Sequence, residues 1–427
     1  MKSGHQHPFL GGLPLIVRKS LRQHLLSTVI TIVSVALAAG LMMAVFAIDS
    51  QTYKAFTGGP MGFDAVLGAR GSQLQLVLNS IFHLETSPGN IPWQLYTTIK
   101  EDPRVELAIP YALGDNYRGY RMVGTVEEIL TRFEYQPGQK FSLQPGGRIF
   151  DSSRREAVIG SFVAQKTGLG LNSRFKPYHG LVFNEKDQHG EEFLVVGVLE
   201  PTNTPADRVI WIPIEGIFRM GGHVLRGSGT DYQAQSGQEI PDEHKEVSSV
   251  MLKFKNPQAG FALDQTINKQ GKVATLAWPL GSVMAELFQK LGWVSRVLSL
   301  VACLVVLVVA GSVLASIYNT MNERRREFAI LRALGARKRT VFSAIVLEAA
   351  TISALGALLG FVIYALILAF AAAIIRNQTG VVLNLLALHP VHLFAPLGII
   401  LIGALAGIVP AFKAYATDVA SNLSPHS

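Results

Sequence analysis

Four long stretches of apolar residues, free or nearly free of charge, interrupt the chain. They cover residues 25–48, 297–318, 341–375 and 391–412. A transmembrane helix needs about 20 apolar residues to cross a hydrocarbon core of roughly 30 Å, and each stretch is long enough. The third is longer than one crossing requires and contains a single charged residue, Glu348. The pattern therefore predicts an α-helical membrane protein with four transmembrane helices.

The basic residues beside these stretches predict the orientation of the chain. Three precede the first stretch closely, and residues 319–340 contain seven Lys or Arg, whereas residues 376–390 contain one. Cytoplasmic segments of membrane proteins carry an excess of Lys and Arg. We therefore expect residues 319–340 and both termini in the cytoplasm, with residues 413–427 as a tail. Residues 376–390 and the long segment 49–296 are expected on the outer side.

The first stretch has one alternative reading, a cleavable signal peptide, because Val45, Phe46 and Ala47 loosely imitate a small-residue cleavage site. Its apolar core has 24 residues, whereas the apolar core of a signal peptide typically has about 7 to 15. We therefore expect a retained membrane anchor. Within the preceding residues 1–24, the segment 13–22 mixes Leu, Ile and Val with Arg and Lys. This mixture predicts an interfacial helix on the inner leaflet.

Small residues recur four positions apart within the predicted membrane helices. Such spacing lets helix backbones approach closely in lipid, although Gly and Ala are also common in membrane helices for other reasons. The pairs are Ala36 with Gly40, Gly311 with Ala315, Gly356 with Gly360, and Gly403 with Gly407. We expect helix packing at the last two pairs.

Residues 49–296 alternate strand-like and helix-like runs, which predicts a mixed α/β domain of one or two lobes. Residues 220–246 are rich in Gly, Ser, Gln and charge, which predicts a mobile loop. The expected strands are 63–67, 105–111, 157–159, 193–199, 209–214 and 250–254, and the expected helices are 73–84, 93–100, 162–167 and 276–296.

Composition agrees with a membrane protein and argues against other classes. Hydrophobic residues make up 49% of the chain and charged residues 16%, where a soluble domain carries about 25% charged residues. The net charge of +8 could suggest nucleic acid, but the basic residues lie beside the apolar stretches, so no nucleic-acid partner is expected. The single cysteine, Cys303, excludes an intrachain disulfide.

Motifs that would make the chain an enzyme are missing from the sequence. It has no Gly-rich phosphate loop, no GxSxG serine elbow and no HExxH zinc motif. His5 and His7 form the closest histidine pair, in a terminus that we expect to be disordered. We therefore expect no catalytic residue, no metal and no cofactor on this chain.

Residues 319–340 contain more than a connection between two crossings needs. On a helix over 323–334, four apolar side chains are expected on one side and three arginines on the other. Gly335 then supplies a helix stop. A linker lying on anionic lipid would explain the arginines but not the apolar side chains, so we expect a docking helix for a partner protein. The apolar residues are Phe328, Ile330, Leu331 and Leu334, and the arginines are Arg325, Arg326 and Arg332.

Glu348 is expected about 10 Å inside the third crossing, where a carboxylate is costly unless it is paired. We expect it to pair with a nearby arginine or to reach the cytoplasmic headgroups. A place on a substrate or proton pathway is the alternative.

The run EFAILRALGARKRTVFSAIVLEA and the closing GIVPAFKAYATDVASNL resemble the FtsX/MacB-like permease domain of type VII ABC transporters, over residues 291–423. In that family the segment after the second crossing is a coupling helix that inserts into a cytoplasmic ATPase. The chain departs from the family at Asp418 and Val419, where proline is frequent, which affects only the tail. The resemblance implies the coupling role for Arg326, Glu327, Ile330, Leu331, Leu334 and Gly335.

The segments EAVIGSFVAQKTGLG, EFLVVGVLEPTN and VIWIPIEGI look like the periplasmic domain of MacB-type permeases, and DAVLGARGSQLQLVLNSIFHLETSPGNIPW resembles MacB/DevC-like permeases. These resemblances imply a homodimer in the bacterial inner membrane, in contact with lipid and with a dimer of a separate cytoplasmic ABC ATPase that binds the ATP. A periplasmic adaptor, lipoprotein or binding protein is a further implied partner. The implied function is export or extraction of a substrate that the sequence does not identify. The alternatives are an FtsX-type regulator of cell-wall hydrolases and a passive membrane scaffold.

Overall fold

The computed structural model describes residues 12–57, 62–180, 184–234 and 238–416. The histidines His5 and His7 and the departures at Asp418 and Val419 lie outside these residues. The chain forms two compact units. We call them the helical unit and the sheet unit. The helical unit comprises the described residues within 12–51, 291–373 and 384–416, and the sheet unit those within 52–290 and 374–383.

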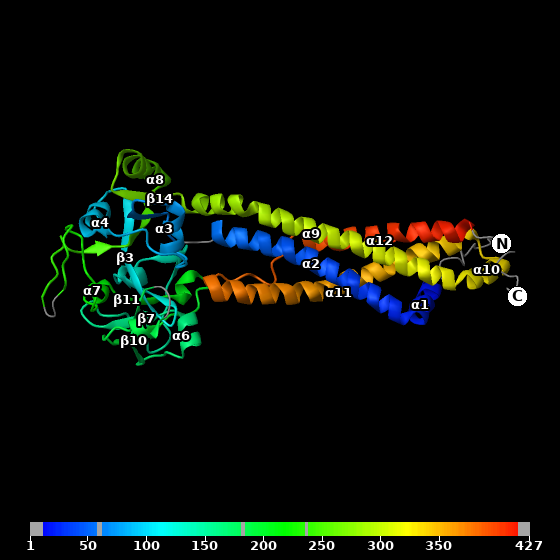
Figure 1. Ribbon diagram of the computed structural model, residues 1–427, viewed down its shortest axis with the longest axis horizontal. Helices are drawn as coiled ribbons and strands as arrows, with labels where there is room; N and C mark the ends of the chain where they lie inside the picture. Colours follow the sequence, from blue (N-terminus) through cyan, green and yellow to red (C-terminus); the bar gives the residue numbers. More distant parts are fainter. Residues whose placement is uncertain (1–11, 58–61, 181–183, 235–237, 417–427) are drawn as a thin grey trace, which may run out of the picture. The chain divides into compact units, whose positions relative to one another are not determined.

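In the part of the chain that the structure describes, four helices are long and apolar enough to cross a membrane, and Figure 1 labels them. They are α2 (Leu25–Thr57), α9 (Leu280–Glu323), α11 (Lys338–Thr379) and α12 (Val391–Ala416). Two shorter helices belong to the same unit, α1 (Leu13–Gln23) and α10 (Arg325–Ala333). The predicted fold class, four apolar helices joined to a mixed α/β domain, is confirmed.

A ten-stranded mixed sheet forms the centre of the sheet unit. Its order is β14-β1-β13-β3-β4-β11-β7-β10-β8, with β9 paired to β3. The pairs β4/β11 and β7/β10 are parallel, and the other pairs are antiparallel. The strands are β1 (Ala65–Ala69), β3 (Val105–Tyr117), β4 (Tyr120–Thr125), β7 (Glu156–Ile159), β8 (Arg174–Phe175), β9 (Tyr178–His179), β10 (Phe193–Val198), β11 (Ile210–Pro213), β13 (Ser249–Phe254) and β14 (Ala274–Ala277).

Short helices and two small two-stranded sheets complete the sheet unit. The two small sheets pair β2 (Ile91–Pro92) with β12 (Glu246–Val247), and β5 (Glu134–Gln136) with β6 (Gln139–Lys140). The helices are α3 (Gln73–Ser80), α4 (Trp93–Lys100), α5 (Glu128–Thr131), α6 (Ser161–Thr167), α7 (Ile214–Phe218) and α8 (Pro257–Asp264), with 3-10 turns at Glu185–Asp187 and Pro205–Arg208 and a π turn at Gln265–Gln270.

The sheet is covered on both faces by apolar residues, and its central strand β11 is apolar throughout. Along β11, Ile210 and Ile212 belong to one buried cluster and Trp211 to the other. Successive side chains of a strand point to opposite faces, and each face here packs against apolar residues. The uninterrupted apolar run of this strand follows from that arrangement.

The helix expected at 276–296 is wrong at its start. Residues Ala274–Ala277 form strand β14, and α9 begins only at Leu280. Pro279 accounts for the boundary, because the residue before a proline is driven away from helical backbone angles. From Leu280 the helix continues without a break to Glu323.

The segment expected to be a mobile loop, residues 220–246, has few regular elements in its described part. A β-bridge joins Leu225 and Tyr232, the backbone N–H of Gly227 donates to the carbonyl of His244, and the segment ends in β12. The side chains of Leu225 and Ile240 are buried in the apolar cluster of the sheet unit. These two side chains attach the loop to the sheet.

Candidate functional site

Along the chain, the short helix α10 connects the two longest apolar helices, α9 and α11. A single residue, Arg324, separates it from α9, and its backbone angles (φ −99°, ψ 8°) are not helical. Gly335 has φ +100°, a region that residues with a side chain rarely adopt, and it ends the helix as the sequence predicts. Two sharp backbone turns therefore isolate α10 from its neighbours.

The expected stripe of four apolar side chains on one side of this helix is wrong. Phe328 is buried, whereas Ile330 is 44% exposed and Leu334 is 80% exposed. Each residue of an α-helix advances by about 100°, so positions 328 and 330 point to nearly opposite sides. Leu331 is half-buried between them, and Arg326 is exposed. The outward apolar surface of α10 is thus a pair, Ile330 and Leu334.

Arg324 holds α10 in place through contacts with three other polar side chains. Its guanidinium donates to Ser20 Oγ at 2.5 Å and to Glu327 Oε2 at 3.0 Å, and lies 3.5 Å from Glu348 Oε2. Ser20 Oγ in turn donates to Glu348 Oε1 at 2.5 Å. The guanidinium also lies over the ring of Phe328, 4.9 Å from its centroid. These contacts join α1, α10 and α11 at one point.

Two charged members of this cluster, Arg324 and Glu348, are removed from water. The side chain of Arg324 is 8% exposed and that of Glu348 is 11% exposed. A buried charge is tolerated when an opposite charge and hydrogen bonds compensate it. Glu348 therefore has its arginine partner within the helical unit, in the residue that directly follows α9.

A second, outer set of contacts ties the end of α1 to the start of α10 and to the end of α9. Gln23 Nε2 donates to Glu327 Oε1 at 3.2 Å, and His24 Nδ1 lies 3.3 Å from Glu323 Oε2. The hydrogen bond from Arg324 is the main reason that the pKa of Glu327 lies below its ordinary value. An ionised Glu327 thus links α10 to both Arg324 and Gln23.

Sequence reasoning did not identify Arg324. The run Arg324, Arg325 and Arg326 offers three equivalent side chains, and helix periodicity alone does not show which one turns inward. The signal that could have identified it was Glu348, because a carboxylate inside an apolar helix requires a basic partner nearby.

The small residues of the apolar helices lie at close contacts between them. A Cβ added at Gly356 would come 2.5 Å from Val35 Cβ, and one added at Gly360 would come 2.6 Å from Ala39 Cβ, both on α2. Added atoms at Gly403 and Gly407 of α12 would strike Ser353 and Ala349 of α11. At Gly311 an added Cβ meets nothing within 4 Å in the described chain.

An apolar cavity of about 220 Å³ lies within the sheet unit. Aromatic rings dominate its wall, and two buried nitrogens there, His83 Nδ1 and Trp211 Nε1, have no hydrogen-bond partner among the described residues. Burial lowers the pKa of His83 to about 3, and the charges of Arg121 and Arg208 add to the effect, so this histidine is neutral. The cavity can therefore take an apolar group that offers one or two polar atoms. The aromatic residues on the wall are Phe63, Phe82, Tyr111, Phe133, Tyr135, Phe141 and Trp211.

Two family models together match most of the chain. Residues 28–269 match the model described as a MacB-like periplasmic core domain. Residues 299–419, which include α10, match the model described as FtsX-like permease C-terminal. A comparison with curated proteins found no match.

Among solved structures, 34 chains match. One is the periplasmic region of MacB from Actinobacillus actinomycetemcomitans, which is 11% identical over 53% of this chain and 94% of that chain, with a TM-score of 0.33. Another is the extracellular domain of the noncanonic ABC-type transporter YknZ from Gram-positive bacteria. It is 15% identical over 49% of this chain and 97% of that chain, with a TM-score of 0.27.

Proposed function

Because the chain belongs to the FtsX/MacB-like permeases of type VII ABC transporters, we propose that α10 is the helix through which a separate cytoplasmic ATPase drives it. The chain is a membrane-embedded permease subunit, and ATP hydrolysis is assigned to the partner. Closure of the ATPase on ATP pushes α10, and the helical unit passes this motion on to the sheet unit. The result is export or extraction of a substrate at the outer face.

The observation that carries this proposal is the two-sided character of α10. Its inner side is held by Arg324 and Phe328, both buried. Its outer side presents Ile330 and Leu334 to the surroundings. Burying one such side chain in a partner contributes about 1.5–3 kcal/mol, and a helix already held in position loses little entropy when it docks. An anchored helix with an exposed apolar pair suits the transfer of force from a partner protein.

The distribution of basic residues and the family support three further parts of the proposal: the orientation in the membrane, the oligomeric state and the partner of the sheet unit. The seven Lys or Arg between residues 319 and 340 favour a cytoplasmic position for α10 and for both termini, in the bacterial inner membrane. The family favours a homodimer of the permease with two ATPase copies. A periplasmic adaptor, lipoprotein or binding protein is the partner proposed for the sheet unit.

Copurification tests the role of α10. The tagged chain is extracted in detergent, and the ATPase recovered with it is measured by quantitative mass spectrometry. We expect about one ATPase per wild-type chain and at least a tenfold loss in the Ile330→Asp/Leu334→Asp double variant, because two charges would enter an apolar contact. Leu386→Asp, at a position 88% exposed in the loop before α12, is the matched control and retains the ATPase.

Two outcomes contradict the proposal. One is a double variant that is inserted at the normal level and keeps the wild-type ratio of ATPase to permease. The other is a wild-type chain that recovers no ATPase at all.

The alternative, regulation of cell-wall hydrolases, predicts a different partner for the sheet unit. The match of residues 28–269 to a MacB-like core domain supports export or extraction instead. Photo-crosslinking from Tyr135, on the wall of the aromatic cavity, distinguishes the two. Recovery of a hydrolase favours regulation, and recovery of a lipoprotein, an adaptor or a small molecule favours transport.

A further inference from the structure

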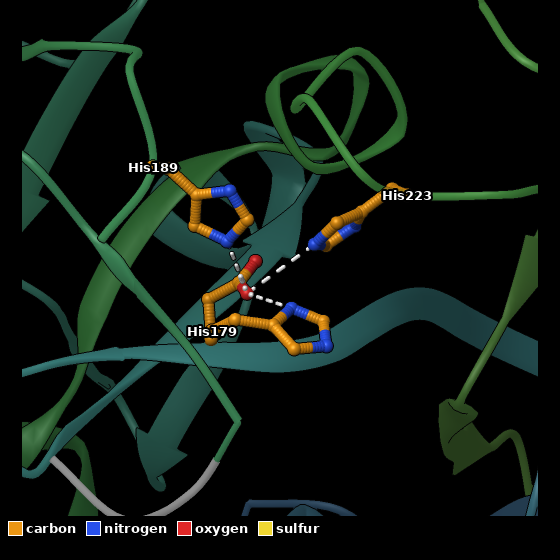
Figure 2. A group of neighbouring side chains, drawn as sticks. His179, His189 and His223 are labelled. Atoms are coloured by element: carbon orange, nitrogen blue, oxygen red, sulfur yellow. Dashed lines mark hydrogen bonds and ion pairs between the residues drawn. The ribbon is translucent and has the colours of Figure 1, made fainter. Parts of the chain in front are cut away.

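Four side chains that are far apart in the sequence meet in the sheet unit, as Figure 2 shows for the three histidines around a carboxylate. Asp115 lies in β3 and His179 in β9. His189 precedes β10, and His223 follows α7. The three imidazole rings are arranged almost symmetrically, with centroids 5.3–5.6 Å apart.

The three rings direct a nitrogen at one oxygen atom. Asp115 Oδ1 lies 3.1 Å from His189 Nε2, 3.2 Å from His179 Nδ1 and 3.3 Å from His223 Nε2. Asp115 is fully buried, and its other oxygen, Oδ2, has no hydrogen-bond partner among the described residues. A buried carboxylate normally has both oxygens satisfied. Here three nitrogens compete for one oxygen while the second has none.

The hydrogen bond of the other ring nitrogen of His189, Nδ1, limits how His189 can contact Asp115. Its Nδ1 lies 3.0 Å from the carbonyl oxygen of Gly221, which can only accept, so Nδ1 carries the proton. A neutral His189 then turns the lone pair of Nε2 toward the carboxylate. Two lone pairs at 3.1 Å repel each other unless a proton or a metal cation lies between them. A backbone carbonyl that fixes the tautomer in this way is the usual support of a metal-binding histidine.

From these contacts we infer that Asp115, His179, His189 and His223 form a binding site for a divalent transition-metal ion, with Zn²⁺ as the best fit. Three imidazole nitrogens and one carboxylate oxygen are ligands that Zn²⁺ takes in tetrahedral geometry. Ca²⁺ and Mg²⁺ prefer oxygen ligands and fit this set poorly.

The distances agree with a tetrahedral ion. At metal–ligand distances of about 2.0 Å, neighbouring ligand atoms of a tetrahedron are about 3.3 Å apart. The three separations from Asp115 Oδ1 are 3.1–3.3 Å. All four ligand atoms lie within 4.8 Å of one another, so a small inward movement of the rings completes the tetrahedron.

Backbone contacts hold the ligands in position without help from an ion. Asp115 and His179 are paired across β3 and β9. The backbone N–H of His189 donates to the carbonyl of Pro177 at 2.9 Å, and that of His223 donates to Met220 at 3.1 Å. A site that is already assembled binds its ion with little cost for ordering the chain.

The site is open to exchange with the surroundings. His179 and His223 lie on the wall of a cavity of about 280 Å³, together with Arg226 and Glu246. The side chain of His179 is 61% exposed, whereas that of His189 is 8% exposed. An ion can therefore reach the buried carboxylate from the side of His179.

The test is metal binding by the purified full chain in detergent. After removal of metal and dialysis against Zn²⁺, we expect about one Zn²⁺ per wild-type chain by elemental analysis. The His189→Ala/His223→Ala variant is expected to bind Zn²⁺ about 100-fold more weakly or not at all. Zn²⁺ raises the unfolding temperature of the wild type and not of this variant, and Mg²⁺ raises neither. His244→Ala is the matched control, because His244 lies in the same segment as His223, residues 220–246, but stacks on Tyr232 outside the cluster. This variant is expected to bind Zn²⁺ as the wild type does.

A gain of signal guards against a variant that merely fails to fold. In His179→Cys, a thiolate replaces one imidazole, and Co²⁺ binding is expected to produce a sulfur-to-metal charge-transfer band that the wild type lacks. The inference is overturned if the wild type binds no more Zn²⁺ than the double variant. It is also overturned if His179→Cys, loaded with Co²⁺, shows the wild-type spectrum.

Discussion

Arg324 shows how one side chain can determine what a surface helix exposes. Its side chain turns inward to Ser20, Glu327 and Glu348 and so fixes the start of α10. Phe328, whose ring lies under the guanidinium, is buried on the same side of the helix. The remaining apolar pair, Ile330 and Leu334, is then directed outward. The surface that we propose for ATPase docking is thus a consequence of one buried ion pair.

Removing Arg324 is expected to destabilise the helical unit. Arg324→Ala leaves Glu348 buried without its charge partner, which costs about 3–5 kcal/mol where a buried pair is broken. We expect a lower unfolding temperature of the detergent-extracted chain, measured by intrinsic fluorescence. The Arg324→Met/Glu348→Met double variant, which removes both charges, is expected to recover most of the loss.

Arg326→Ala is the matched control for this prediction, because Arg326 belongs to the same run and is exposed. Its effect on stability is expected to stay within about 0.5 kcal/mol. Equal losses in Arg324→Ala and Arg326→Ala would show that the ion pair does not hold the helix.

At the scale of elements, the apolar helices approach one another most closely at glycines. Apolar surface gives helices little reason to associate in lipid, so close backbone contact has to supply the attraction. Gly356 and Gly360 of α11 provide it against α2, and Gly403 and Gly407 of α12 provide it against α11. The helix α11 therefore lies between two close contacts.

A single added methyl group is expected to disturb the contact between α2 and α11. In Gly356→Ala the new Cβ would come 2.5 Å from Val35 Cβ, so one of the helices has to move. Such overpacking costs about 1–3 kcal/mol, read as a lower unfolding temperature in detergent. Gly311→Ala, where nothing within 4 Å meets the new atom in the described chain, is expected to cause no loss. The reverse order of the two variants would contradict close packing at Gly356.

For the whole molecule, the central expectation is that α10 and the loop before α12 lie on opposite sides of the membrane. Two exposed leucines of the helical unit, one next to α10 and one in the loop before α12, are positions where a cysteine can be introduced to show on which side of the membrane each segment lies. Leu334 is 80% exposed and Leu386 is 88% exposed. The only native cysteine, Cys303, can be replaced by serine to give a background free of thiols.

Thiol labelling tests this orientation. In spheroplasts of the Cys303→Ser background, a membrane-impermeant maleimide is expected to label Leu386→Cys and to spare Leu334→Cys. Inverted membrane vesicles are expected to give the opposite pattern. Labelling of Leu334→Cys from outside would place α10 on the wrong side for an ATPase and would end the proposed function.

Properties that are local in the sequence could be predicted from it. Four runs of apolar residues are sufficient to predict four membrane helices, because the cost of exposing polar groups to lipid acts on each segment by itself. Helix α4, Trp93–Lys100, also has the predicted bounds, since its hydrophobic pattern is complete within eight residues. The resemblance to FtsX/MacB-like permeases also depended on contiguous residues, and the family matches agree with it.

Only the tertiary structure decided which distant residues meet. The inward turn of Arg324 depends on Ser20 and Glu348, which are 304 and 24 positions away. The convergence of Asp115 with His179, His189 and His223 depends on the pairing of β3 with β9 and on two loops. No spacing motif connects these four residues, and the sequence by itself predicted no metal site. Hydrophobic periodicity acts over a few turns of chain, whereas the position of a buried charge or a ligand set is determined by packing across the whole unit.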